Sequence, residues 1–208
     1  GGNAPGGYQF GVAISSGSTV IGGTSEELSI TGTGGNSTGI VNRGVSLDGS
    51  GVLVSSQGCP VRLNGTSGAS GSGYGIGVSV LNGAVLSSGF GGVYVTGIST
   101  ATSGGSNWGM EMGGSGSVIS TSSGGSILLT ASGGAGNSPG IIITNNSSVN
   151  TPAAGGSITF ESDSVSIDTS VTTASPSSVV TFRPYSTNRN ILIGGADDST
   201  SLGLTDAE

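Results

Sequence analysis

The chain of 208 residues contains 44 glycines, no histidine, and eleven acidic residues against four basic ones, which gives a net charge of −7. This balance leaves no basic stripe for nucleic acid or anionic lipid, so neither is expected as a partner. No apolar run approaches the length of about 18 residues that a membrane span needs, so membrane insertion is not expected either.

Glycine-led apolar segments recur along the chain and define a repeat of about 32 residues. They begin at Gly11, Gly44, Gly77, Gly109 and Gly140, which are 33, 33, 32 and 31 residues apart. A fixed period in this range is typical of solenoids, propellers and arrays, and the strand-forming composition of each repeat favours a β-solenoid.

A second set of apolar segments recurs once in each repeat. Side chains alternate along a strand, so one face of each segment should point inward and the other outward. The inward pairs are Leu28 and Ile30, Val61 and Leu63, Val93 and Val95, Ile127 and Leu129, and Ile158 and Phe160. The outward residues between them are Ser29, Arg62, Tyr94, Leu128 and Thr159. In the glycine-led segment from Gly44, we expect Val45 and Leu47 inward and Ser46 outward.

A third, weaker set of segments completes each repeat. Its expected column is Val20, Leu53, Val85, Val118 and Val149, spaced 33, 32, 33 and 31 residues apart. Three strands per repeat predict an all-β fold, a parallel β-helix solenoid in which about 32 residues form one triangular coil. Successive coils should stack about 4.8 Å apart around an aliphatic core. Polar loops such as 34–42 and 68–75 should line one edge of the rod.

The repeat pattern changes near residue 157. We expect residues 1–156 to form regular coils, of which the first is partial. Residues 157–208 have irregular strand spacing, Pro176 and Pro184, and seven of the eleven acidic residues. They are predicted to form less regular coils that continue the same rod. Because the chain opens within a repeat and stops without a capping element, we expect it to be a fragment of a longer protein.

Two groups of motifs resemble a known family. They are LSITGTGG at 28–35 followed by GVSL at 44–47, and VTFRPYST at 180–187 with NILIGG at 190–195 and LGLTDAE at 202–208. Both resemble the repeat region of filamentous haemagglutinin-like proteins, large bacterial exoproteins exported by two-partner secretion. The resemblance implies a right-handed helix, export through an outer-membrane secretion partner, and a role in adhesion or as a surface filament. It carries over no functional residue.

These features predict a secreted or cell-surface structural and adhesive rod segment of a bacterial adhesin or filament, without catalysis, metal or cofactor. Expected partners are glycans or surface proteins of host or neighbouring cells. Open strand edges at the ends of the stack predict end-to-end self-association. Outward Tyr94, together with Trp108 beside a glycine-led strand, could stack on a sugar ring, and corner packing is the alternative interpretation of these aromatic residues.

Two other functions compete with the rod. A β-helical polysaccharide hydrolase or lyase could use Asp48 and Glu111 as an acid/base pair, with Cα atoms roughly 10 Å or more apart. An ice-binding solenoid would need a flat, regular threonine array. The outward column Ser46, Ser79, Glu111 and Ile142 does not provide one.

Other motifs favour ordinary structural interpretations. The G-x-S-x-G spelling at 136–140 has neither a histidine base nor a helix to support a nucleophile. The stretch 113–118 begins like a calcium-binding nonapeptide but has Val118 where the metal-binding aspartate belongs. Cys59 is expected to pack at a turn. The glycosylation triplets at Asn36, Asn64 and Asn146 are frequent by chance in such a composition.

Overall fold

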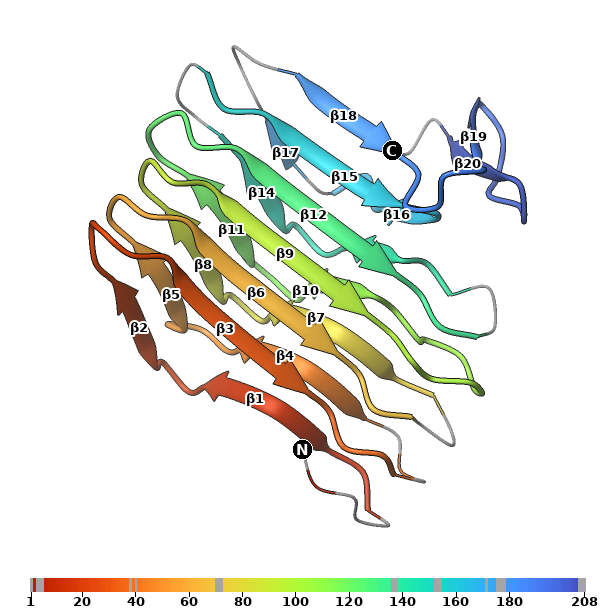
Figure 1. Cartoon of the computed structure of the whole chain (residues 1–208), viewed down its shortest axis with the longest axis horizontal. Coiled ribbons are helices and arrows are strands. Elements are labelled where there is room, and N and C mark those ends of the chain that lie inside the picture. Colours follow the sequence, from red (N-terminus) through yellow and green to blue (C-terminus); the bar gives the residue numbers. More distant parts are fainter. Residues whose placement is uncertain are drawn as a thin grey trace.

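The computed structural model describes residues 2, 6–37, 39, 41–69, 73–135, 138–151, 155–170, 172–174 and 179–205. Within these residues there are twenty strands and no helix, and eighteen of the strands form three parallel sheets of six. Figure 1 shows the strands stacked as successive coils, which confirms the predicted parallel β-solenoid. The same residues contain no helix long and apolar enough to cross a membrane.

Each sheet takes one strand from each coil, and the coils are numbered one to six in chain order. Sheet A contains β1 (Gln9–Ser15), β4 (Asn42–Asp48), β7 (Gly75–Leu81), β10 (Met110–Gly113), β13 (Ile141–Ile143) and β16 (Val165–Ile167). Sheet B contains β2 (Thr19–Gly22), β5 (Leu53–Ser56), β8 (Val85–Ser88), β11 (Val118–Thr121), β14 (Ser148–Asn150) and β17 (Thr172–Ala174). Sheet C contains β3 (Leu28–Thr33), β6 (Val61–Thr66), β9 (Val93–Ile98), β12 (Ile127–Ser132), β15 (Ile158–Ser162) and β18 (Val180–Arg183).

The inward columns of sheets A and C are confirmed. Leu28 pairs with Val61, and Val61 pairs with Val93, so equivalent residues lie above one another along the rod. Val45 and Leu47 are fully buried, as are the inward residues of sheet C from coil two onward as far as Phe160. Together they form one aliphatic core between the three sheets.

The predicted column of sheet B is wrong in its middle coils. Leu53 pairs with Thr19 and Val85, and the buried column consists of Val20, Val54, Leu86, Ile119 and Val149. Leu53, Val85 and Val118 are partly exposed instead. Each of these strands has two adjacent apolar residues, so an alternating pattern fits either phase and a shift by one residue exchanges the two faces.

Sheets A and C meet backbone to backbone at a column of glycines beside the core. A Cβ added to Gly65 would lie 2.0 Å from the carbonyl oxygen of Gly77, and one added to Gly44 would lie 2.3 Å from the amide nitrogen of Thr66. We call this column the glycine waist; its residues are Gly32, Gly65 and Gly97 of sheet C, Gly44 and Gly77 of sheet A, and Gly109, which directly precedes β10. The waist explains why an apolar strand begins with glycine in coil after coil.

Beyond the waist, the loops from sheet C to sheet A form a second, hydrogen-bonded compartment, here called the polar lobe. In the described part of these loops, the side chain of Asn107 is fully buried. Its Oδ1 accepts a hydrogen bond from the amide of Gly75 at 3.2 Å. Its Nδ2 donates to the carbonyls of Ser103, Gly104 and Ala135 at 3.0, 3.0 and 3.2 Å. Such pairing offsets the cost of burying a polar side chain.

Coil six lacks the polar lobe, because only Asp163 and Ser164 connect β15 to β16. β15 to β18 extend the three sheets of the regular coils. Residues 184–205, here called the C-terminal segment, contain β19 (Asn190–Ile193) and β20 (Ser201–Leu204), which form a separate two-stranded parallel sheet. Leu202 of this segment is fully buried in the main core. In Figure 1 the small sheet lies beside the end of β16.

Candidate functional site

The two carboxylates proposed as an acid/base pair share one arginine on the outer face of sheet A. The guanidinium of Arg43, from β4, lies 3.8 Å from Oδ2 of Asp48 and 3.4 Å from Oε2 of Glu111. Glu111 belongs to β10, so the arginine side chain extends past β7 to reach it. On its way, Nη1 donates to Oγ of Ser46 at 3.4 Å.

This arginine explains why an outward column is buried. Ser46 and Ser79 point outward as the sequence predicts, yet they are only 3% and 0% exposed. The hydroxyl of Ser79 donates to that of Ser46 at 3.1 Å, which satisfies part of their hydrogen-bonding capacity beneath the arginine. The outer face of sheet A is therefore covered by a layer of long side chains in coils two to four.

The environment of Glu111 shifts its pKa upward. Burial raises the pKa of Glu111, the positive charge of Arg43 opposes this effect, and the negative charge of Asp48 adds to it. The side chain of Glu111 is 20% exposed, whereas that of Asp48 is 39% exposed. The site thus holds two carboxylates that differ in exposure and share one arginine.

Trp108 lies in the same layer and packs against Tyr74, a residue that the sequence pattern does not indicate. The amide of Gly77 donates to the carbonyl of Trp108, which aligns Trp108 with Ile76, and Ile76 in turn aligns with Arg43. The ring centroids of Trp108 and Tyr74 are 6.4 Å apart at an interplanar angle of 84°. Tyr74 remains 45% exposed. Edge-to-face packing of this kind stabilises an aromatic pair beyond the area it buries.

Two further features distinguish this layer of side chains. Ile76 is fully buried although it does not belong to the main core, so side chains of the outer layer cover it. Tyr74 has a backbone φ of 58°, in the left-handed region that costs a non-glycine residue about 1–2 kcal/mol. Arg43, Asp48, Tyr74, Trp108 and Glu111 are hereafter called the face-A cluster.

Tyr94, the other predicted carbohydrate contact, lies on a different face. It is an outward residue of β9 in sheet C, and the guanidinium carbon of Arg62 is 4.8 Å from its ring centroid. Nε of Arg62 also donates to Oε1 of Glu27 at 3.1 Å. The structure therefore does not bring Tyr94 and Trp108 into one site. Tyr74 could have been noticed because Tyr8 and Tyr74 occupy equivalent positions two repeats apart, each directly before a strand of sheet A.

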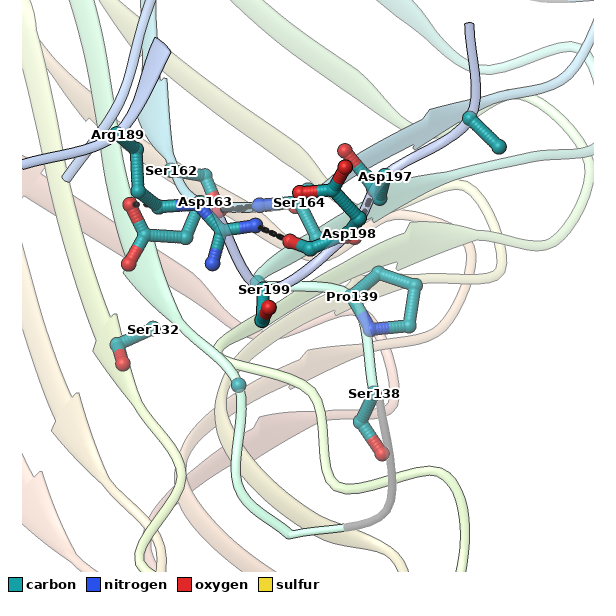
Figure 2. Close-up of a pocket in the computed structure, with 13 residues that line it drawn as sticks. Ser132, Ser138, Pro139, Ser162, Asp163, Ser164, Arg189, Asp197, Asp198 and Ser199 are labelled. Carbon is teal, nitrogen blue, oxygen red and sulfur yellow. Dashed lines mark hydrogen bonds and ion pairs between the residues drawn. The ribbon is translucent and has the colours of Figure 1, made fainter. Parts of the chain in front are cut away.

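A cavity of about 760 Å³ lies between the polar lobe and the C-terminal segment. Figure 2 shows Arg189 and Asp163 on one side of it, with Asp197 and Asp198 on the facing loop. Its other labelled lining residues are Ser132, Ser138, Pro139, Ser162, Ser164 and Ser199. Serines and aspartates are the most frequent residues of the lining, beside glycine, proline and alanine.

The carboxylates of this cavity hold the C-terminal segment in place. Oδ1 of Asp163 accepts the amide of Ser186 at 2.8 Å and lies 3.9 Å from Nε of Arg189. Asp197 accepts hydrogen bonds from the hydroxyl of Ser164 and from the amide of Gly203. These contacts indicate that the walls of the cavity hold the C-terminal segment against the coils.

Asp198 and the remaining motifs also have structural partners. Hydrogen bonds from Thr200 lower the pKa of Asp198 below its ordinary value. No group of three or more potential metal-binding side chains is found among the residues that the structure describes. The G-x-S-x-G motif at 136–140 falls partly outside those residues, and the hydroxyl of Ser138 donates to the carbonyl of Ala135. Cys59 is buried.

Comparison with known proteins adds no relative to these observations. No family model, no curated protein and no solved structure matches the chain.

Proposed function

We propose that the chain is a structural and adhesive segment of an extracellular rod, part of a bacterial surface adhesin or filament. The observation that carries this proposal is the use of charge: each of the four arginines pairs with a carboxylate of another coil or segment. The pairs are Arg43 with Glu111, Arg62 with Glu27, Arg183 with Glu161, and Arg189 with Asp163.

Uncharged side chains form the same kind of link between coils. Ser87 donates to Ser55 at 3.0 Å, and Asn82 donates to Asp48 at 2.7 Å. Such bonds add to the backbone ladders that already connect each coil to the next. A stack held in this way suits a load-bearing rod, and many weak contacts along its polar faces could sum by avidity. The extracellular location is supported by the resemblance of its repeats to filamentous haemagglutinin-like proteins.

The first coil favours end-to-end self-association of the isolated chain. At the N-terminal end, β1, β2 and β3 form the outer edges of the three sheets. Their inward residues are only partly buried; they include Val12, Ile14, Val20, Leu28 and Ile30. Open strand edges beside exposed apolar residues favour pairing with another chain. Sedimentation over a wide concentration range should therefore show dimers or longer assemblies, and a monomer at every concentration would contradict this part of the proposal.

Adhesion is tested by immobilising the chain at several surface densities and measuring its binding to bacterial or host cells and to a broad glycan array. We expect binding that rises steeply with density, because avidity depends on simultaneous contacts. Cooperative thermal unfolding of the same preparation serves as the folding control. A folded chain that binds nothing at any density would leave a passive rod and remove adhesion from the proposal.

Polysaccharide hydrolysis is a second candidate, favoured by one observation. Burial raises the pKa of Glu111 while the more exposed Asp48 lies on the same face, as a general acid and a general base require. The test is release of reducing sugar from a panel of polysaccharides. Activity lost in both Glu111→Gln and Asp48→Asn would favour the enzyme over the rod, and no product in the parent chain would eliminate it.

A further inference from the structure

We propose that the face-A cluster is a binding site for a neutral oligosaccharide, with Tyr74 and Trp108 as its stacking surface and Glu111, Arg43 and Asp48 as its polar groups. This inference rests on the adhesive part of the proposed function and gives it a place and a ligand class.

The residues of the cluster lie on two neighbouring outward columns of sheet A and beside them. One column runs through Arg43, Ile76 and Trp108, and the other through Ser46, Ser79 and Glu111. Glu111 follows Trp108 by three residues, just as Ser46 follows Arg43 by three, and the guanidinium of Arg43 contacts Ser46. The columns therefore place the aromatic pair and the Arg43–Glu111 pair side by side on one face.

The aromatic pair has a shape that suits a sugar ring. The rings of Tyr74 and Trp108 are nearly perpendicular, at 84°, so they form a corner. A sugar ring can stack its C–H face on one ring while the other bounds its edge. Tyr74 is 45% exposed, and Trp108 is partly exposed, so both rings are accessible.

The polar groups of the cluster have the chemistry that sugar hydroxyls require. Carboxylates accept hydrogen bonds from hydroxyl pairs, and a guanidinium donates to hydroxyl and ring oxygens. These groups are held before any ligand arrives, because Arg43 already contacts both Asp48 and Glu111. A preorganised site avoids much of the ordering cost of binding.

The charge of the cluster favours a neutral ligand. The cluster contains one guanidinium and two carboxylates, and the whole chain carries a net charge of −7. A saccharide with carboxylate or sulfate groups would be repelled. Neutral hexose or N-acetylhexosamine oligomers carry the hydroxyl groups that this site can bind without that repulsion.

The experiment uses the only tryptophan of the chain as its probe. Trp108 fluorescence is titrated with cello-, malto- and chito-oligosaccharides, and with oligogalacturonate as the acidic comparison. We expect a saturable change with at least one neutral oligosaccharide and none with oligogalacturonate. Tyr74→Ala should weaken binding about tenfold, the order expected when one aromatic contact is lost. Glu111→Gln should weaken it several-fold.

Matched variants separate binding from folding. Tyr94→Ala removes an aromatic residue from sheet C and should leave the titration unchanged. Trp108→Phe retains a stacking ring and should keep binding on a glycan array, whereas Trp108→Ala should lose it. Cooperative unfolding of every variant is measured in parallel, so that lost binding in a folded variant is assigned to the site.

The outcomes distinguish this site from the wider proposal. Array binding that survives Tyr74→Ala and Glu111→Gln, without any change in Trp108 fluorescence, overturns the site and leaves the adhesive rod intact. A blank array together with unchanged fluorescence across the panel overturns both the site and the adhesive part of the proposed function. Neutral-sugar binding that depends on Tyr74 and Trp108 supports the inference.

Discussion

At the glycine waist, sheets A and C can approach each other because each residue has a hydrogen atom where other amino acids have a Cβ. The nearest neighbours of a Cβ at Gly65 would be the carbonyl oxygen and carbon of Gly77, at 2.0 and 2.7 Å. Both belong to backbone that is held in sheet A, so neither can move aside as the end of a flexible side chain could. The waist residues are thus fixed by the spacing between the sheets.

We therefore expect Gly65→Ala to destabilise the chain by about 3 kcal/mol or more, the upper range for overpacking a rigid interior. Gly105→Ala is the matched control, because a Cβ there would meet nothing within 4 Å. Urea unfolding of both variants measures the difference. Equal stability of the two would show that sheets A and C can separate at the waist without cost.

Glu111 should make the stability of the folded chain depend on pH. Burial raises its pKa in the folded chain above 4.5, the ordinary value for a glutamate. The folded state then binds the proton more readily than the unfolded state. Protonation of Glu111 stabilises the fold as pH falls through the raised pKa, and the effect is complete below 4.5. Any advantage of Glu111→Gln over the parent chain should shrink as the pH is lowered from neutral.

Asp168 provides a control of opposite sign. A backbone hydrogen bond from Ser170 lowers the pKa of Asp168 below 3.8. Its contribution to stability is present above that value and is lost as pH falls through the lowered pKa. Relative to the parent chain, Asp168→Asn should therefore be least stable at neutral pH and recover on acidification. Urea titrations at several pH values measure both trends, and parallel trends in the two variants would contradict this assignment.

At the scale of the strand, sheet B shows what local patterns leave open. Its strands place two apolar residues in succession, Leu53 and Val54 or Val85 and Leu86, and the structure buries the second of each pair. Sheets A and C have a clear alternation, so their phase could be read directly. The strand β5 follows a turn in which Gly51 adopts positive φ.

The corrected phase predicts unequal costs for the same substitution in neighbouring coils. Leu86→Ala should cost about 2–5 kcal/mol, because it opens a cavity in the core. Leu53→Ala should cost less than about 1 kcal/mol, since its side chain is outward and partly exposed. Thermal unfolding of both variants provides the measurement. A larger loss of stability in Leu53→Ala than in Leu86→Ala would show that Leu53 is the inward residue, as expected from the sequence.

The fold could be predicted further than the face-A cluster could. Glycine-led strands spaced by about 32 residues specify stacked coils, and stacking then aligns equivalent residues without further information. The cluster depends instead on how far one side chain extends: Arg43 reaches Glu111 across an intervening strand. Its aromatic pair joins Tyr74 to Trp108, 34 positions later in the chain. No local pattern reports a contact of either kind.

At the scale of the whole molecule, the C-terminal segment is attached to the stack by the buried side chain of Leu202 and by a small number of polar contacts. Asp163 contributes most of them, through Ser186 and Arg189. Arg189 also donates to the carbonyl of Ser201 at 2.8 Å, which ties the contact to β20. Loss of the Asp163 carboxylate should therefore loosen the segment without unfolding the coils.

Trypsin can detect this loosening, because the chain has few cleavage sites. Arg183 precedes a proline, which blocks cleavage, and leaves the bond after Arg189 as the site within the C-terminal segment. Asp163→Ala should increase cleavage after Arg189 several-fold while the coils stay intact. Glu26→Ala, which removes the same charge from coil one, should leave the rate unchanged. Equal rates in the parent chain and Asp163→Ala would show that this carboxylate does not hold the segment.

Coil six shows that the stack and the polar lobe are independent of each other. There the lobe shrinks to Asp163 and Ser164, yet Ile141 still pairs with Val165 in sheet A, and Ile158 still pairs with Val180 in sheet C. The three stacked sheets are therefore the constant part of each coil, and the polar lobe is a variable one. A loop of the polar lobe can lengthen, shorten or change its chemistry while the sheets keep their pairing. In such a chain the loops along one edge can differ from coil to coil while the stacked sheets remain the same.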